Sequence, residues 1–217
     1  LYKETQGRDS IQRFGAPLTT VNAYYSPVTN TITIFAGITT APFFHLEYSP
    51  VSLYATIGMI IGHELSHAMD NNGRLFDLEG SLTDWWTEAD VEGFKSRAQC
   101  IITEYGPPQG CENVNYGKQT LGEDIADITG ITLALNAYES RHGISTESRR
   151  KFFTIFSQMW AESYDQRHLC NRVDSDVHAV AWFRVDKTLR QLDAFRTAFD
   201  CSKETQMVHK NKCKIYG

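Results

Sequence analysis

One apolar run of the sequence, residues 57–70, contains the pattern His-Glu-x-x-His at positions 63–67. Ser49-Pro50 is a typical helix start and Asn72-Gly73 a typical stop, so a single helix of about six turns is predicted between them. Residues four apart share one face of a helix. The imidazoles of His63 and His67 therefore converge on one point, and the fold has to be built around the helix that carries them.

Two imidazoles at this spacing suit a zinc ion, which prefers nitrogen and sulfur ligands in a tetrahedral arrangement. Glu64 lies too far around the helix to be a third ligand, but it can take a proton from a water molecule at the metal. The alternative is a pair of ordinary, partly buried histidines. Because the pattern is rare by chance in a chain of average composition, we expect one zinc ion per chain and a hydrolytic reaction.

A catalytic zinc ion needs a third protein ligand, and Glu123 is the best candidate. It stands at the start of a second apolar helix, predicted over residues 121–142. Asp127 follows one turn later on the same face, where it could hold the far nitrogen of a ligand histidine. A second interpretation stays open, because Thr120 and Glu123 also have the spacing of a capping box, in which Glu123 only bonds back to the helix start.

Composition and charge limit the class of protein. The chain has 217 residues, 41% of them hydrophobic, which is ample for a core, and we predict one catalytic domain over residues 1–217. A net charge of −5 without a basic block argues against nucleic acid or an anionic membrane surface as a partner. No apolar stretch approaches the roughly 18 residues that span a bilayer. The sequence starts at Leu1 without an initiator Met, so we expect a part of a larger protein.

The remaining patterns predict a mainly α protein with a small β element (α+β). Residues 19–25 and 31–35 are β-branched and aromatic and flank a turn-rich segment, which indicates a β-hairpin. Helical spacing of apolar residues predicts three further helices, over residues 85–105, 146–160 and 185–200. Loops are predicted over residues 100–118 and 174–176.

The cysteines favour disulfide bonds. None of the five forms a Cys-x-x-Cys pair, which argues against zinc-ribbon and thioredoxin-like sites. Disulfides are preferred over buried reduced thiols, and the odd number leaves at least one cysteine free or bonded outside this chain.

A series of motifs follows in order along nearly the whole chain: Val21-Asn22-Ala23-Tyr24-Tyr25, Phe35-Ala36-Gly37-Ile38, Pro42-Phe43-Phe44, Ile61-Gly62-His63-Glu64-Leu65-Ser66-His67, Asp70-Asn71-Asn72-Gly73-Arg74, Asp84-Trp85-Trp86, Leu121-Gly122-Glu123-Asp124-Ile125-Ala126-Asp127, Ser175-Asp176-Val177-His178 and Phe183-Arg184. Together they resemble the neprilysin and endothelin-converting-enzyme family of zinc metallopeptidases, in its C-terminal catalytic domain. The resemblance implies a thermolysin-like fold. It also implies an ectoenzyme, extracellular or at the cell surface, that cuts peptides on the amino side of hydrophobic residues.

The resemblance implies roles at the metal. The zinc ligands would be His63, His67 and Glu123, with Glu64 as the general base. The ligand histidines would be hydrogen-bonded by Asp70 and Asp127. The oxyanion of the reaction would be stabilised by His178, which Asp176 would orient. From the residues alone, His178 is more typical of a surface histidine.

The resemblance also implies a substrate site. The substrate backbone would be bound by Asn22, Ala23 and Arg184, although Arg184 taken alone is more typical of a solvated charge. The pocket for the residue after the cut would be lined by Ile38, Phe43, Met59, Ile60 and Trp160.

For the cysteines, the resemblance implies that Cys100 pairs with Cys213 and that Cys201 bonds the part of the protein that precedes this chain. Cys111 and Cys170 are then left to pair with each other. The chain departs from the family at Asp124, where Asn is usual, and at Ala179-Val180, where Pro is usual. Neither departure removes an expected ligand.

Two other functions compete with a zinc endopeptidase. The first is a non-catalytic family member that binds peptides or serves as a subunit, and the intact Glu64 argues against it because such a chain has no physical need for a base there. The second is an aminopeptidase, which needs acidic groups for the substrate's amino terminus. The sequence has no extra carboxylate pattern for that task.

Overall fold

Helices make up most of residues 14–216, the part of the chain that the computed structural model describes. The strands are β1 Ala23–Ser26 and β2 Thr31–Ile34. The α-helices are α2 Pro50–Leu53, α3 Met59–Ser66, α4 Glu88–Glu104, α5 Tyr116–Gln119, α6 Leu121–His142, α7 Thr146–Met159, α8 Gln166–Ser175, α9 Ala181–Leu189 and α10 Asp193–Ala198. The expectation of a mainly α protein with a small β element is confirmed.

The hairpin forms where the sequence predicts it, but its strands are shorter than predicted. β1 and β2 pair antiparallel, with Ala23 opposite Ile34 and Ser26 opposite Thr31. Asn30 closes the turn with a positive φ of 47°, a conformation that Asn tolerates better than most residues. Ala23 is buried at the start of β1, so the hairpin is anchored to the interior at that end.

The motif helix runs without a break from Pro50 to Met69. It begins as α2, continues through a π-helical segment at Tyr54–Gly58 and α3, and ends in a 3-10 turn at His67–Met69. Pro50 occupies the first turn as predicted, where its missing N–H costs nothing. The sequence did not indicate the π-helical segment.

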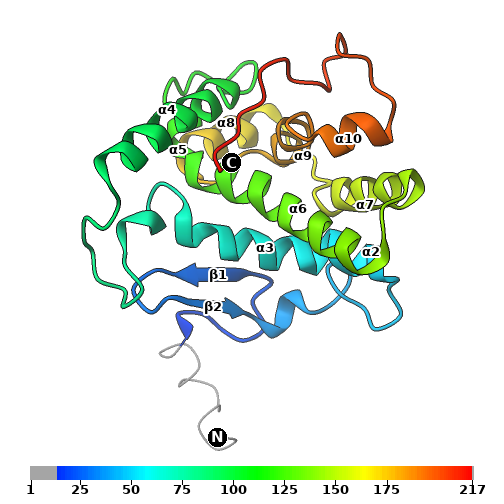
Figure 1. Cartoon of the computed structure of the whole chain (residues 1–217), viewed down its shortest axis with the longest axis horizontal. Helices are drawn as coiled ribbons and strands as arrows, with labels where there is room; N and C mark the ends of the chain where they lie inside the picture. Colours follow the sequence, from blue (N-terminus) through cyan, green and yellow to red (C-terminus); the bar gives the residue numbers. More distant parts are fainter. Residues whose placement is uncertain (1–13, 217) are drawn as a thin grey trace, which may run out of the picture.

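Helix α3 lies between the hairpin and α6 (Figure 1). Gly62 and Gly130 allow α3 and α6 to touch backbone to backbone. A Cβ at Gly62 would lie 2.6 Å from the Gly130 carbonyl oxygen, and one at Gly130 would lie 2.5 Å from the His63 nitrogen. The largest buried cluster surrounds this contact and includes Met59, Ile60, Ile131, Leu135, Phe152, Phe153 and Phe156.

Several helix bounds differ from the prediction. The helix expected over residues 185–200 is two helices, and between them lies buried Gln191, whose Oε1 accepts a hydrogen bond from Cys213 N at 2.8 Å. The predicted loop over residues 100–118 is partly helical, since α4 runs to Glu104 and α5 begins at Tyr116. Helix α8 covers two of the three residues predicted as a loop at 174–176. Helix α7 starts as predicted, with Ser145 Oγ accepting from Ser148 N at 3.0 Å.

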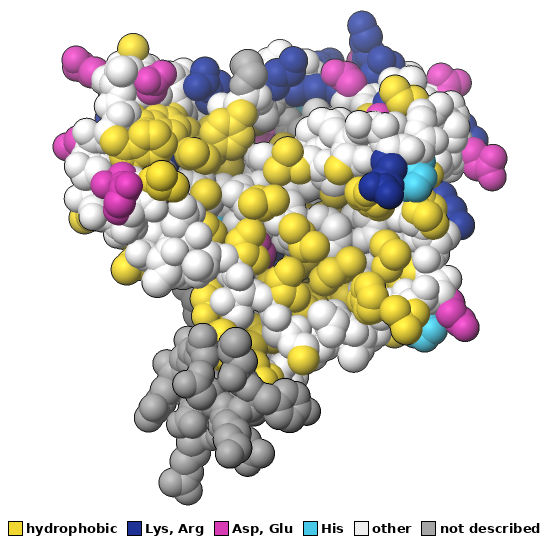
Figure 2. All heavy atoms as spheres, turned by 60° about the horizontal axis from the view of Figure 1, so that its bottom comes forward, with side chains coloured by type: hydrophobic (Ala, Val, Ile, Leu, Met, Phe, Trp, Pro, Cys, Tyr) yellow, Lys and Arg dark blue, Asp and Glu magenta, His cyan; other side chains and the backbone are white. Residues whose placement is uncertain are grey.

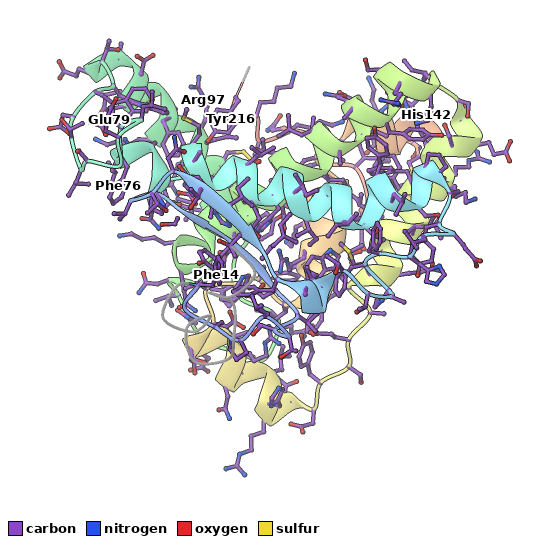
Figure 3. The ribbon with its side chains drawn as sticks, turned by 90° about the horizontal axis from the view of Figure 1, so that it is seen from below. Phe14, Phe76, Glu79, Arg97, His142 and Tyr216 are labelled. Atoms are coloured by element: carbon purple, nitrogen blue, oxygen red, sulfur yellow. A yellow bond between two sulfur atoms is a disulfide. The ribbon has the colours of Figure 1, made fainter. Side chains whose placement is uncertain are left out.

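Two disulfides connect distant segments. Cys100 bonds Cys213, and Cys111 bonds Cys170, so both expected pairs are present. The first joins α4 to the C-terminal tail. The tail then reaches the end of the motif helix, where the Tyr216 hydroxyl donates to the Met69 carbonyl (Tyr216 is labelled in Figure 3). Cys201 is a half-buried free thiol.

The glycine contact gives a first prediction. Gly62→Ala should lower the free energy of unfolding by about 1–3 kcal/mol, because the new methyl group would overlap the Gly130 carbonyl unless the two helices separate. Denaturant titration of each variant measures this change. Gly106→Ala is the control, since a Cβ at Gly106 meets nothing within 4 Å. Equal stability of the two variants would contradict the close contact.

Candidate metal centre

Two imidazole nitrogens meet at the C-terminal end of α3. The Nε2 atoms of His63 and His67 lie 3.0 Å apart. A carboxylate contacts the Nδ1 atom of each ring: Asp127 Oδ1 is 2.8 Å from His63 Nδ1, and Asp70 Oδ2 is 2.7 Å from His67 Nδ1. Because a carboxylate can only accept, each Nδ1–H donates, and each Nε2 is left as the position for a proton or a metal ion.

The carboxylate of Glu123 completes the cluster. Its Oε2 lies 3.1 Å from His63 Nε2 and 3.7 Å from His67 Nε2. One ligand atom from each of the three residues lies within 4.8 Å of the others. The capping-box interpretation is therefore wrong. Thr120 has helical dihedral angles and no capping hydrogen bond, so Glu123 is free to face the histidines.

The electrostatics of the cluster favour a cation. Burial would lower the pKa of His63, but hydrogen bonds to Asp127 and Glu123 outweigh it and raise the pKa to about 9. Burial would raise the pKa of Glu123, but the hydrogen bond and charge of His63 bring it to about 2. The space between the three side chains thus holds a positive charge readily and keeps Glu123 ionised.

Asp127 joins the histidine to a buried arginine. Arg184 donates from Nε to Asp127 Oδ2 and from Nη2 to Asp127 Oδ1, both at 2.7 Å. Arg184 is 8% exposed and its guanidinium lies 3.8 Å from the centre of the Trp160 ring. Burial opposes ionisation of Asp127, yet Arg184 holds the pKa of Asp127 below its usual range. Arg184 is therefore not the solvated charge that its sequence context suggested.

A cleft of about 520 Å³ opens beside the cluster. Asn22 and Ala23 of the hairpin line one side, and Glu64 lies in the wall with the two histidines. Glu64 is only 5% exposed, and this burial raises the pKa of its carboxyl group. Figure 2 shows hydrophobic side chains gathered around a hollow on this lower face of the molecule.

Four of the five expected pocket residues line the cleft, namely Ile38, Phe43, Ile60 and Trp160. Met59 does not. Its side chain is fully buried in the core cluster and is absent from the cleft lining, whereas Ile38 and Ile60 belong to the same cluster and also reach the cleft. This corrects the expectation for Met59.

His178 reaches the cluster from the segment between α8 and α9. Its Nε2 lies 3.3 Å from Glu123 Oε2, and its side chain is 42% exposed along the cleft. Asp176 Oδ1 accepts hydrogen bonds from the backbone N of His178 at 2.9 Å and from its Nδ1 at 2.8 Å. Burial alone would raise the pKa of Asp176, but these two hydrogen bonds lower it. The tertiary structure thus brings together the end of α3, the start of α6 and the segment between α8 and α9, which are far apart in the sequence.

Gln119 is a cleft residue that the sequence did not indicate. Its Nε2 donates to the Asp176 carbonyl at 2.6 Å and to the Val173 carbonyl at 3.1 Å. These bonds hold the C-terminal end of α8 against α5. Because 57 positions separate Gln119 from Asp176, no local pattern could have connected them.

Asp124 is a buried acid next to the cluster. It is 0% exposed, its Oδ2 accepts from the Thr120 hydroxyl at 2.7 Å, and its Oδ1 has no hydrogen-bond partner. Burial raises the pKa of this carboxyl group well above its usual range. The side chain therefore favours the neutral form, which resembles the amide that the family usually has at this position.

Known proteins match nearly the whole chain. The sequence model of peptidase family M13 matches residues 22–215. Mouse neprilysin is 37% identical over 210 residues, which are 90% of this chain and 28% of neprilysin. An endothelin-converting enzyme homologue of Locusta migratoria is 36% identical over 214 residues, or 94% of this chain and 29% of that protein. The chain thus spans less than a third of the length of these relatives.

Solved structures agree with this match. The zinc metalloprotease Zmp1 of Mycobacterium tuberculosis, in complex with an inhibitor, superposes with a TM-score of 0.85 and 29% identity over 97% of this chain and 34% of that one. PepO of Lactobacillus rhamnosis has a TM-score of 0.84 and 30% identity over 91% of this chain and 31% of that one. The fold is that of the thermolysin-like zinc peptidases. Within this class, the chain belongs to peptidase family M13.

Asp124 gives a prediction that depends on pH. Above pH ~4, the unfolded chain releases a proton that the folded chain retains, so the contribution of Asp124 to stability falls as pH rises towards its elevated pKa. Asp124→Asn should therefore raise the free energy of unfolding by about 1 kcal/mol, and by more at pH 8 than at pH 5. Urea titration at both pH values, with exposed Asp84→Asn as the control, measures the difference. A variant that is less stable at pH 8 would show that the buried carboxylate is favourable.

Proposed function

We propose that this chain is the catalytic domain, residues 1–217, of a zinc-dependent endopeptidase that forms the C-terminal part of a larger ectoenzyme. The observation that carries the proposal is the convergence of His63, His67 and Glu123 beside buried Glu64 in a cleft of peptide-binding size. Membership of a peptidase family supports it.

The donor set fits zinc. Two imidazoles and one carboxylate are a known ligand set of catalytic zinc sites, which leave the fourth position open. Glu123 Oε2 is buried and lies 3.1 Å from His63 Nε2 and 3.7 Å from His67 Nε2, so a cation held by the two imidazoles would also meet this carboxylate. One zinc ion per chain, bound by these three residues, would act as a Lewis acid that polarises the peptide carbonyl and acidifies water.

Glu64 is the proposed general base. It accepts the proton of the water that attacks the peptide carbonyl, and it then passes this proton to the leaving amine. Its burial supports the role, because the raised pKa brings the carboxyl group closer to the working pH.

His178 is the proposed donor to the oxyanion that develops on the substrate. Asp176 fixes the ring by accepting from Nδ1, so the Nε2 side is directed towards Glu123 and the cleft. Because Nδ1–H donates to Asp176, Nε2 is a donor when the ring is doubly protonated. Such a donor, already in place, requires no reorganisation as charge develops on the substrate oxygen.

The substrate backbone is proposed to lie along β1. Among the described residues the sheet has two strands, so one edge of β1 is not paired within it, and Asn22 and Ala23 line the cleft. An extended peptide can add to such an edge through backbone hydrogen bonds. Arg184 also lines the cleft, and the N–H groups that Asp127 does not use can donate to a substrate carbonyl.

The disulfides support an extracellular or cell-surface location, because such bonds persist in oxidising compartments. No helix among residues 14–216 is long and apolar enough to span a bilayer. We propose that the half-buried Cys201 bonds the preceding part of the larger protein, which would also help to enclose the cleft. Peptides are the proposed substrates.

Substrate preference tests the hydrophobic pocket. A peptide library should show cleavage before Phe, Leu or Ile, since burying such a side chain contributes roughly 1.5–3 kcal/mol. Phe43→Asp should remove the preference. Leu46→Asp is the matched control, because Leu46 is 88% exposed and does not line the cleft. Preferred cleavage before Lys or Asp by the unmodified protein would contradict the pocket assignment.

Two substitutions separate the ligand from the base in the full-length protein. Glu64→Gln removes the proton acceptor but keeps its shape, so zinc content should stay near one ion per chain while the rate falls ~10²–10⁴-fold. Glu123→Gln offers a weaker neutral ligand, so zinc and activity should decline together, and added zinc should partly restore both. Metal analysis and a peptidase assay measure these effects.

Each alternative result has a definite meaning. Near-normal turnover by Glu64→Gln would show that Glu64 is not the general base, and the proposed mechanism would be wrong. Normal zinc content in Glu123→Gln would show that another acid is the third ligand.

A further inference from the structure

The last turn of α8 carries an arginine, Arg172, that contacts Asp176, the carboxylate that holds the His178 ring. Arg172 Nη2 donates to Asp176 Oδ2 at 2.8 Å. A backbone hydrogen bond joins the same two residues, since Asp176 N donates to the Arg172 carbonyl at 2.8 Å. The side-chain bond and the end of the helix therefore fix Asp176 relative to Arg172.

The two oxygens of Asp176 have separate partners. Oδ1 accepts from the backbone N and from Nδ1 of His178, whereas Oδ2 accepts from Arg172. A carboxylate held at one oxygen can still rotate about its bond to Cβ. When both oxygens are held, the orientation of the carboxylate is fixed, and with it the orientation of the His178 ring.

Arg172 is itself well supported. Its guanidinium lies 5.4 Å from the centre of the Tyr164 ring, and Glu162 Oε2 is 3.7 Å from its Nη1. Helix α8 is tied to the loop between α4 and α5 by the disulfide between Cys111 and Cys170. An arginine in this setting can act as a fixed point rather than a mobile surface charge.

Arg172 lies outside the substrate cleft. It lines a smaller neighbouring cavity, of about 150 Å³, that shares Trp160, His178 and Arg184 with the cleft. Its hydrogen-bonded link to the cleft runs through Asp176 to His178.

We propose that Arg172 is a positioning residue for His178, acting through Asp176; this inference rests on the proposed peptidase function. The competing explanation is a partly exposed ion pair at the end of α8, which contributes little to stability and nothing to the reaction. The shared carboxylate distinguishes the two, because an ordinary ion pair of this kind would not end on the residue that holds His178.

Kinetics of the full-length protein test the proposal. Arg172→Met should lower kcat by about tenfold, the lower end of the range for outer partners of active-site groups, with little change in KM. Arg172→Lys should recover most of the loss, because it keeps a charged donor. Arg167→Met is the control, since Arg167 is exposed on the same helix. Unchanged kcat in Arg172→Met, or an effect on KM alone, would overturn the proposal.

A double substitution tests the path through Asp176. If Arg172 acts through that carboxylate, Arg172→Met should have no further effect in an Asp176→Asn background. If the loss of rate in the double variant equals the product of the losses in the two single variants, Arg172 acts independently of Asp176, and the proposal would be overturned.

A measurement without substrate separates this proposal from the peptidase assignment. In ¹⁵N-edited NMR spectra, the Nδ1–H signal of His178 should be sharp in the unmodified protein and in Arg167→Met, and broadened by exchange with water in Arg172→Met. An unchanged signal would refute positioning by Arg172. Absence of peptidase activity in the unmodified protein would refute the proposed function, and the NMR comparison would still decide the role of Arg172.

Discussion

At Gly62 and Gly130, helices α3 and α6 pack with no side chain between them. Because α3 and α6 are so close together, two acids one turn apart on α6 can contact the two sides of a single imidazole. Glu123 meets the Nε2 side of His63, and Asp127 meets its Nδ1 side. Both acids lie one turn apart on the same helix, so a wider separation of α3 and α6 would remove both contacts at once. The metal centre thus depends on a backbone contact made outside it.

Charge links this contact to the rest of the cleft. His63, Asp127 and Arg184 form a buried hydrogen-bonded chain, and the Arg184 guanidinium lies against the ring of Trp160. A buried guanidinium without Asp127 would be very unfavourable, so the pair has to form together. The metal centre is therefore connected to the wall of the hydrophobic pocket, by hydrogen bonds as far as Arg184 and by a cation–π contact from Arg184 to Trp160. His178, which is more exposed, is held by Asp176, and Asp176 in turn is bonded by Gln119 of α5 and Arg172 of α8.

The sequence alone determined the features that repeat within a few residues. Helical spacing placed His63 and His67 on one face, and the same rule placed Glu123 and Asp127 together on a second helix. β-branched and aromatic residues around a turn predicted the hairpin. Resemblance to the family added the disulfide pair Cys100–Cys213, which the structure contains. The helix and hairpin predictions succeeded because helix and turn formation depend on neighbouring residues, whereas the disulfide joins cysteines 113 positions apart and was predicted only through the resemblance.

Tertiary structure decided which way each side chain faces when its partner is far along the chain. Glu123 could cap its own helix or face His63, and only the packing of α6 on α3 selects the second. Met59 could line the pocket or fill the core, and it fills the core. Gln119 carries no local signal, since its partner Asp176 is 57 positions away. Contacts of this kind depend on how whole helices pack, and that packing depends on the complete buried surface of the protein rather than on any short stretch of it.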